Sequence, residues 1–292
     1  MTATDLSSPP EKRNLIQRVL SALVLIPVVL GILIYGSPLL ICLLVLVIAV
    51  IGWSEYANLV DAMGVPTYKF TGFFLTVIFV WAHFFQMSPS MANQDQFPFM
   101  LRGIFEVWPL LALVLLFVAC LKSDENLQTG LERAVYTLFG SLYVGGLLGF
   151  FLQLPSPETG SKYVFFVFLV VWMGDIAGYF VGKAIGRHKL APKVSPGKTI
   201  EGAVANTMGG MAGGALAIGT FLPSLGWLHG LLVAGICAII GQFGDLFESF
   251  LKRSAGVKDS GTLIPGHGGV LDRIDSLLFA GPAFFYVHNA FG

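Results

Sequence analysis

A dense group of charged residues lies between positions 245 and 275 of a chain in which only 12% of residues are charged. Apolar segments precede and follow this group. A charged side chain at membrane depth costs at least about 2.5–3.5 kcal/mol, so such residues usually face a cavity, a partner or an ion. We therefore interpret the segment as a functional site. Its charged residues are Asp245, Glu248, Lys252, Arg253, Lys258, Asp259, His267, Asp272, Arg273 and Asp275.

Two acidic pairs in this segment have the same spacing. Asp245 and Glu248 are three residues apart, as are Asp272 and Asp275, and residues three apart lie on one face of a helix. Carboxylates that converge in one pocket require a counter-charge. Mg²⁺ prefers oxygen ligands and keeps phosphate oxygens in its shell. We therefore predict a site for one or two Mg²⁺ ions, with Asp245 and Asp272 as direct ligands and with Asp275 and Glu248 either as further ligands or as residues that support them.

Glycines accompany both acidic pairs. Gly241 and Gly244 precede Asp245 and permit another group to approach closely. Between the pairs, Pro265–Gly269 does not favour a continuous helix, and its glycines let backbone N–H groups approach an anion. The alternative, a solvated loop with incidental charges, is disfavoured because the carboxylates occur where apolar segments end. The segment therefore predicts a site for a metal ion and phosphate.

A second polar region precedes this one. Asp175 lies inside an apolar segment, so its carboxylate must either bond to a neighbouring helix or face a polar pocket. Further on, Ser195 and Pro196 suit the N-cap and first position of a helix, whose N-terminus would bind phosphate with the help of Lys198. A P-loop is excluded, because it requires glycine where this chain has Pro192.

Taken together, the two regions resemble the phosphatidate cytidylyltransferases, or CDP-diacylglycerol synthases. The likeness covers roughly residues 172–275, and residues 1–150 match only as a generic hydrophobic bundle. The resemblance implies a reaction of CTP with phosphatidate that gives CDP-diacylglycerol and pyrophosphate, with Mg²⁺ as cofactor. It rests on Asp175, Ser195–Gly202, Ser249, Lys252, Arg253, Lys258, Asp259, Pro265–Gly269, Asp272, Arg273 and Asp275.

Residue chemistry and this resemblance together suggest roles for the site. We expect metal ions held by carboxylates to position the α-phosphorus of CTP for in-line attack. His267 is expected to hydrogen-bond a phosphate or orient a ligand rather than act as a base. The residues expected to act in catalysis are Asp245, Asp272, Lys258, His267 and Arg273. Those expected to bind substrate are Asp175, Ser195, Lys198, Thr199, Glu201, Ser249, Lys252, Arg253, Gly266, Gly268 and Gly269.

The composition is that of a membrane protein. Of 292 residues, 55% are hydrophobic, and 17 acidic residues balance 17 basic ones. This profile, with a mean hydropathy of +0.78, excludes a soluble globular domain and a nucleic-acid-binding protein. We predict an all-α polytopic integral membrane protein of about nine transmembrane helices joined by short loops. The expected spans are 15–35, 38–54, 70–87, 104–121, 134–152, 163–183, 199–221, 227–248 and 272–290.

The basic residues test this topology. With the N-terminus inside, 15 of the 17 lysines and arginines fall in cytoplasmic segments, leaving only Arg102 and Lys162 outside. Such a bias is typical of cytoplasmic loops. We therefore expect an integral protein of a bacterial inner membrane, with its N-terminus and active site in the cytoplasm.

Three regions are expected along the chain. Residues 1–14 are predicted to form a disordered cytoplasmic tail, 15–152 transmembrane helices for scaffold and oligomerisation, and 153–292 the transmembrane catalytic region. Glu55 either lines the pocket or is a solvated helix end, and we favour the helix end. Small-residue patterns at Gly145–Gly149 and Gly209–Gly214 suit contacts within the bundle or between subunits, and we expect a homodimer that binds CTP, phosphatidate and the bilayer but no nucleic acid.

Two other function classes share some of these features. Acids within the membrane and glycine-broken helices also occur in ion- or proton-coupled transporters. That reading requires acids near the midplane and symmetry between the halves, whereas here the acids gather at helix ends. Another lipid phosphotransferase of the CDP-alcohol type is disfavoured because its D-G-x-x-A-R motif is absent.

Overall fold

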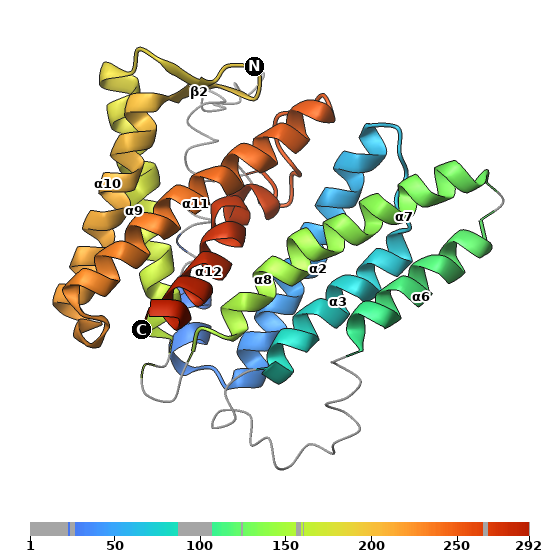
Figure 1. Cartoon of the computed structure of the whole chain (residues 1–292), viewed down its shortest axis with the longest axis horizontal. Coiled ribbons are helices and arrows are strands. Elements are labelled where there is room, and N and C mark those ends of the chain that lie inside the picture. Colours follow the sequence, from blue (N-terminus) through green and yellow to red (C-terminus); the bar gives the residue numbers. More distant parts are fainter. Residues whose placement is uncertain are drawn as a thin grey trace, which may run out of the picture.

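The computed structural model describes residues 23, 27–86, 107–123, 125–155, 159, 161–264 and 268–291 (Figure 1). Within them the chain is helical apart from one small β-hairpin and short bridges in loops. The first half comprises α2 (Pro38–Ala62), α3 (Lys69–Gln86), α6 (Trp108–Leu121), α7 (Leu127–Ser141), η2 (Leu142–Gly146), α8 (Leu147–Gly149) and η3 (Phe150–Leu152). The second comprises α9 (Lys162–Ile185), β1 (Lys189–Ala191), β2 (Ser195–Thr199), α10 (Ile200–Thr220), η4 (Pro223–Leu225), α11 (Trp227–Ser254) and α12 (Leu271–Phe291).

The expectation of a helical membrane protein is confirmed, but the count of nine spans is not. In the described part of the chain, five helical stretches are long and apolar enough to cross a bilayer: 38–62, 69–86, 127–152, 162–185 and 227–254. The apolar α6 has only 14 residues. Helices α10 and α12 coincide with two expected spans but are not among the five. Most of the expected first span lies outside the described residues.

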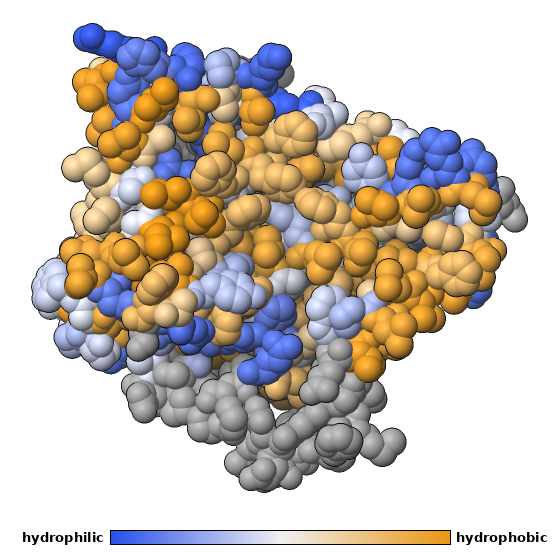
Figure 2. All heavy atoms as spheres, in the orientation of Figure 1, coloured by the Kyte–Doolittle hydropathy of each residue, from blue (hydrophilic) through white to orange (hydrophobic). Residues whose placement is uncertain are grey.

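The surface carries the hydrophobic side chains that a bilayer requires. Figure 2 shows them across the middle of the molecule, with hydrophilic residues gathered over the hairpin at the upper left. Leu110, Leu113 and Phe117 of α6 are among those exposed. Exposed apolar patches of this extent are rare on soluble proteins and mark contact with lipid or another protein. The structure therefore supports an integral membrane protein.

Glycines determine how closely α10 packs. This helix lies beside α9 at the left of Figure 1, and α11 crosses the pair. A Cβ at Gly209 or Gly213 would lie 2.7 Å from a backbone carbonyl oxygen of α9. On the other side, a Cβ at Gly210 or Gly214 would lie 2.6 or 2.5 Å from an alanine Cβ of α11. The expected tight packing within the bundle is confirmed.

A similar approach brings α11 against α12. A Cβ at Gly244 would clash with the backbone carbonyl of Asp275, and one at Gly241 would lie 3.4 Å from the carbonyl oxygen of Ser276. The expectation that these glycines admit another group is confirmed, and that group is the backbone of α12. The contact places Asp245, the next residue of α11, close to Asp275.

In the first half, α2 is fixed by two aromatic residues. Trp53 lies against Gly72 of α3, and its indole N–H donates to the carbonyl of Lys69 at 3.2 Å. Tyr56 packs against Gly140 of α7, and its hydroxyl donates to a backbone carbonyl of α7 at 3.1 Å. Both side chains are buried. The end of α2 is therefore held firmly against its neighbours.

The structure corrects the expected helix start at Ser195. Residues 195–199 form β2, which pairs antiparallel with β1, with Lys189 opposite Thr199. Helix α10 begins at Ile200, and Thr199 is its N-cap, with an extended backbone and an Oγ1 that accepts the Gly202 N–H at 3.1 Å. Ser195 and Thr199 both have side chains suited to an N-cap. Pairing with β1 satisfies the backbone up to Thr199, so the helix starts there.

Candidate active site

A cavity of about 660 Å³ lies between α9, the hairpin, α10 and α11. It brings together residues that are far apart in the sequence. Five of the predicted site residues line it: Asp175, Ser195, Lys198, Thr199 and Asp245. Lys183 and Lys189 also line it, so three lysines and two carboxylates face one space.

The central contact of the cavity joins the hairpin to α11. Lys198 Nζ lies 2.6 Å from Asp245 Oδ2, and the other oxygen of Asp245 accepts the Ser249 hydroxyl at 3.4 Å. The lysine makes this ion pair without a well-aligned hydrogen bond. Its side chain is about a quarter exposed, at 26%, but Nζ itself is buried and has no hydrogen-bond partner among the described residues.

Asp175 lies on the opposite wall, where Oδ1 accepts a hydrogen bond from Asn206 Nδ2 of α10 at 3.1 Å. Both alternatives considered for this residue apply, because the carboxylate bonds to a neighbouring helix and also lines the cavity. Asn206 was not anticipated. The available signal was its polar amide within a glycine-rich apolar segment.

An apolar groove of about 270 Å³ adjoins the cavity along α10 and α11. The two spaces share Leu190, Ala203 and Gln242. Elsewhere the groove is lined mainly by hydrophobic side chains such as Val204, Ile239 and Phe243, all exposed on the outer surface of the bundle. A polar space and an apolar one therefore lie side by side, as an amphipathic ligand requires.

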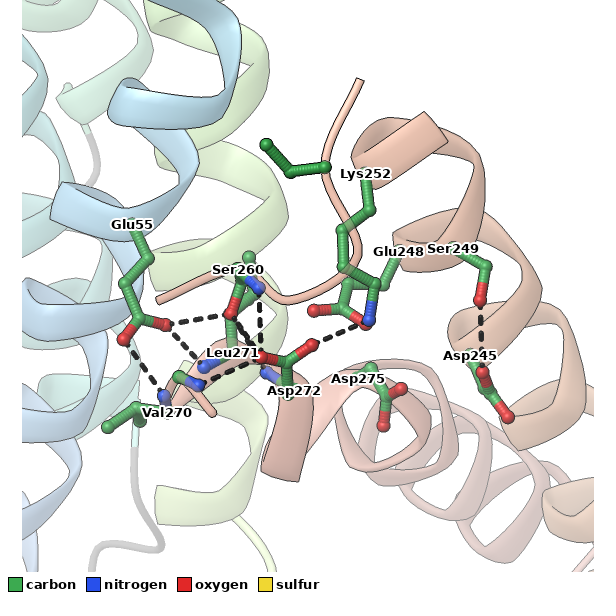
Figure 3. A network of polar contacts seen from close by, with 12 residues as sticks. Glu55, Asp245, Glu248, Ser249, Lys252, Ser260, Val270, Leu271, Asp272 and Asp275 are labelled. Carbon is green, nitrogen blue, oxygen red and sulfur yellow. Dashed lines mark hydrogen bonds and ion pairs between the residues drawn. The ribbon is translucent and has the colours of Figure 1, made fainter. Parts of the chain in front are cut away.

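A second polar cluster lies between α11 and α12 (Figure 3). Lys252 forms ion pairs with Glu248 Oε2 and with Asp272 Oδ1, the latter at 2.6 Å. Glu248 is fully buried, and its Oε1 has no hydrogen-bond partner among the described residues. Burying charges is unfavourable unless they are paired, so Lys252 is what permits these two carboxylates to lie here.

The second oxygen of Asp272 is also held by the protein. Oδ2 accepts the backbone N–H of Ser260 at 2.9 Å and that of Gly269 at 2.8 Å, and the Ser260 hydroxyl lies 2.9 Å away. Gly268 adopts φ +82°, and a Cβ there would lie 2.8 Å from this carboxylate. The loop that contains Gly268 and Gly269 therefore folds closely around the Asp272 carboxylate at the start of α12.

Glu55 was wrongly interpreted as a solvated helix end. It is only 6% exposed, because α2 continues through it to Ala62. Its carboxylate accepts the backbone N–H groups of Val270 at 2.9 Å and Leu271 at 2.7 Å, and Ser260 Oγ lies 3.1 Å away (Figure 3). The sequence signal was an acid at the end of an apolar run. Its partners, more than 200 residues away, carry no local signal.

Asp275 lies between Asp245 and Asp272 in Figure 3. Its Oδ1 accepts its neighbouring N–H, from Ser276, at 2.7 Å. No described lysine, arginine or histidine forms an ion pair with it, and its charge repels that of Asp245. Of the four carboxylates expected in one pocket, Asp245 lines the cavity and the other three lie between α11 and α12.

The remaining predicted residues have other positions. Glu201 accepts the backbone N–H groups of Arg187 and His188, which closes the base of the hairpin. Arg253 donates to the carbonyl of Val194 in the hairpin turn at 3.4 Å. It also donates within the loop that follows α11.

Lys258 and Arg273 are exposed and form no ion pair with the described residues. Gly266 and His267 lie outside the described part of the chain.

Comparisons with known proteins agree over most of the chain. The model of the cytidylyltransferase family matches residues 16–291. A protein of Haemophilus influenzae named phosphatidate cytidylyltransferase is 34% identical over 287 residues, covering 93% of this chain and 98% of its own. One of the same name from Staphylococcus epidermidis is 33% identical, covering 91% and 95%. Another, from Brucella suis, is 47% identical over 152 residues, covering 52% and 56%.

Proposed function

This chain belongs to the cytidylyltransferase family, and we propose that it transfers CMP from CTP to phosphatidate, giving CDP-diacylglycerol and pyrophosphate. Relatives that carry the name phosphatidate cytidylyltransferase match nearly its whole length. The alternatives of a coupled transporter and a CDP-alcohol transferase have no support of this kind.

One observation carries the choice of substrates: the polar cavity adjoins an apolar groove. At about 660 Å³, the cavity falls within the size range of small-molecule sites. Its three lysines attract phosphate groups, while the groove offers hydrocarbon a surface that already faces the bilayer. A nucleotide and a lipid that must react with each other could meet where the two spaces join.

The residues of the cavity suit the binding of two anions. Lys198 is held at the cavity by Asp245 but keeps protons for another acceptor. The first turn of α10 begins at Thr199 beside it, and a helix N-terminus favours negative charge. We assign Lys198 to the phosphates of CTP, because a charge-assisted hydrogen bond holds such groups strongly.

The proposed chemistry needs no covalent enzyme intermediate. A phosphate oxygen of phosphatidate forms a bond to the α-phosphorus of CTP, and the bond from that phosphorus to the bridging oxygen of the β-phosphate breaks. Pyrophosphate leaves with the electron pair. Since the nucleophile is already an anion, no proton has to be removed from it. The protein has to hold two polyanions in line and reduce their repulsion.

The donor chemistry of the site fits Mg²⁺, which we propose as cofactor. Carboxylates outnumber the two lysines that pair with them, and Glu248 has a buried oxygen without a partner. Among the described residues, no three acidic, histidine or cysteine side chains form a ready-made cage. Mg²⁺ commonly binds through one or two carboxylates plus substrate phosphates. We propose Asp245 and Asp275 as its first contacts, with Glu248 and Asp272 beside them.

When bound, Mg²⁺ would neutralise charge on the CTP phosphates and on the departing pyrophosphate. Asp245 is the proposed ligand that already faces the cavity. Lys252 keeps Glu248 and Asp272 in place whether or not the cofactor is present.

The test is a direct assay of the purified protein in detergent. Incubation with CTP, phosphatidate and Mg²⁺ should yield CDP-diacylglycerol and pyrophosphate in equal amounts. ATP, GTP and UTP in place of CTP should give much less product, and EDTA should stop the reaction until Mg²⁺ is added in excess. Failure to form CDP-diacylglycerol, or equal use of ATP, would contradict the proposal.

We also propose that the protein lies in a bacterial inner membrane with this cavity on the cytoplasmic side, and that it is a homodimer. The bias of lysine and arginine supports the orientation. The dimer is a separate expectation, which the mass of the protein–detergent complex would test by light scattering.

A further inference from the structure

Glu55 lies outside the region to which the sequence assigned catalysis, yet it contacts the loop that holds Asp272. It comes from α2, and its partners are Ser260, Val270 and Leu271. A carboxylate that is 6% exposed is costly to bury unless its oxygens are hydrogen-bonded. Here both oxygens are, and every partner belongs to the segment between α11 and α12 or to the first residue of α12. The contact is therefore specific to that segment.

The contacts place Glu55 at the start of α12. Leu271 is the first residue of this helix, and the first N–H groups of a helix lack intrahelical partners and carry partial positive charge. Glu55 accepts two N–H groups there, those of Val270 and Leu271. It acts as a cap supplied by another helix. Asp272, one residue further on, turns back to accept the Gly269 N–H at 2.8 Å.

The Ser260 hydroxyl connects the two carboxylates. Ser260 Oγ lies 3.1 Å from Glu55 Oε2 and 2.9 Å from Asp272 Oδ2. A hydroxyl has one proton and can donate to only one of them at a time. The Ser260 and Gly269 N–H groups donate to Asp272 in either case. Glu55 and Asp272 thus both contact Ser260 of the loop, so the position of Glu55 determines the position of the loop and, with it, that of the Asp272 carboxylate.

Glycines make room for this arrangement. A Cβ at Gly261 would lie 2.6 Å from Glu55 Oε1, and a Cβ at Gly269 would lie 2.5 Å from Glu55 Oε2. On the other side, Trp53 and Tyr56 fix α2 against α3 and α7. The Glu55 carboxylate thus extends from a fixed helix, α2, into the loop. A side chain at Gly261 or Gly269 of the loop would clash with it.

We infer that Glu55 is a positioning residue, which orients Asp272 by holding the loop between α11 and α12 against α2. The inference rests on the proposed function for the role of Asp272 in the reaction. Glu55 itself does not line the cavity. Replacing it should therefore reduce turnover without changing the affinity of the cavity for CTP.

The first test is Glu55→Gln, which keeps the shape but places an amide NH₂ among N–H and O–H donors. We expect kcat to fall about 10- to 100-fold, the usual effect of removing a residue that orients a ligand, with KM for CTP changed by less than about twofold. Asp61→Asn is the matched control, because it neutralises another α2 carboxylate, one that pairs with Lys69. Its kcat should match that of the unmodified protein.

A double-mutant cycle separates positioning from general damage to the fold. Ser260→Ala removes the hydroxyl between the carboxylates and leaves the Glu55 bonds to α12 intact. If Glu55 acts on Asp272 through the Ser260 hydroxyl, the decreases in kcat caused by Glu55→Gln and Ser260→Ala are not independent. The kcat of the double variant is then much higher than the product of the two single decreases predicts. Glu55→Gln combined with Lys198→Ala should instead show losses that multiply.

The outcomes are distinct. An unmodified protein that forms no CDP-diacylglycerol would refute the proposed function. An active protein whose Glu55→Gln variant keeps normal kcat, or whose Glu55 and Ser260 losses multiply, would overturn the positioning role. If Glu55→Gln does not fold in detergent, Ser260→Ala alone decides, and full activity in that variant would overturn the inference.

Discussion

At the scale of single residues, the ion pair of Lys198 with Asp245 contributes little to the stability of the fold. This ion pair is partly exposed, and such pairs contribute only about 0–1 kcal/mol. Because this ion pair contributes little to the free energy of unfolding, the proposed role of Lys198 is to bind a ligand in the cavity.

We therefore predict that Lys198→Ala weakens CTP binding. A hydrogen bond to a charged group contributes about 1.5–3 kcal/mol, so KM for CTP should rise roughly 10- to 100-fold while the melting temperature stays nearly constant. Lys193→Ala is the control, since Lys193 is exposed in the hairpin turn and does not line the cavity. Steady-state kinetics with varied CTP would measure both, and an unchanged KM in Lys198→Ala would exclude the contact.

The sequence identified the residues whose charge is unusual for their surroundings, such as Asp175 and Asp245. It did so because charge within apolar segments is unfavourable unless it has a use. It could not assign Glu55 or Asn206, because the meaning of these side chains depends on partners in other helices. The local sequence around a carboxylate at the end of an apolar run is the same whether the side chain faces water or a buried helix terminus.

At the scale of helices, the contact between α11 and α12 governs where the acidic residues lie. Gly244 touches the backbone of Asp275. Because the neighbour of Gly244 is the backbone of α12 and not a flexible side chain, it cannot move without displacing the helix.

We predict that Gly244→Ala separates the two helices and disturbs the acidic cluster. Overpacking typically costs 1–3 kcal/mol, so both the melting temperature and kcat should fall. Gly235→Ala on the same helix is the control, because a Cβ there meets only the Met211 side chain at 3.6 Å. Thermal unfolding and activity in the same detergent would compare them, and equal behaviour of the two variants would refute the argument.

The groove along α10 gives a prediction about the lipid substrate. Val204→Trp should fill part of a space of about 270 Å³ and raise KM for phosphatidate, with little change in KM for CTP. Met208→Trp is the control, since Met208 is exposed on the same helix but does not line the groove. Assays in mixed micelles would vary the surface concentration of phosphatidate. A rise in KM for CTP alone would argue against a lipid groove.

The start of α10 shows where local rules are insufficient. Ser195 and Thr199 both suit an N-cap, and nothing in the segment itself chooses between them. Pairing of β1 with β2 decides for Thr199. The expected helix terminus is thus present, four residues later than predicted, and Lys198 precedes it instead of lying within it.

At the scale of the whole molecule, α10 has the length of a transmembrane helix. Its 21 residues rise about 30 Å, which is close to the thickness of the hydrocarbon core. The hairpin lies at one end of this helix and Ser224 of η4 just beyond the other.

We predict that these two ends react with labels from opposite sides. In a Cys120→Ser background, Lys193→Cys should react with a membrane-impermeant maleimide only from the cytoplasmic side. Ser224→Cys should react only from the other side, and the remaining Cys42 and Cys237 are buried. Labelling of inside-out and right-side-out vesicles would measure this. Both sites reacting from one side would contradict the orientation.

Hydropathy alone predicted the class of protein and most helix positions, since the expected segments from 38–54 onward each overlap a helix of the structure. It did not establish which helices span. The glycines of α10 and the acidic residues of α12 lower the hydropathy of these helices, and the same residues pack the helices together or lie at the candidate site.

The Glu55 contact has a consequence for any attempt to divide the protein. The start of α12 is capped by a side chain that lies more than 200 residues earlier in the sequence, so we predict that the C-terminal half has no activity by itself. A gene cut between α8 and α9 should yield two inactive products, and co-expressing them should restore CDP-diacylglycerol synthesis only while the first fragment retains Glu55.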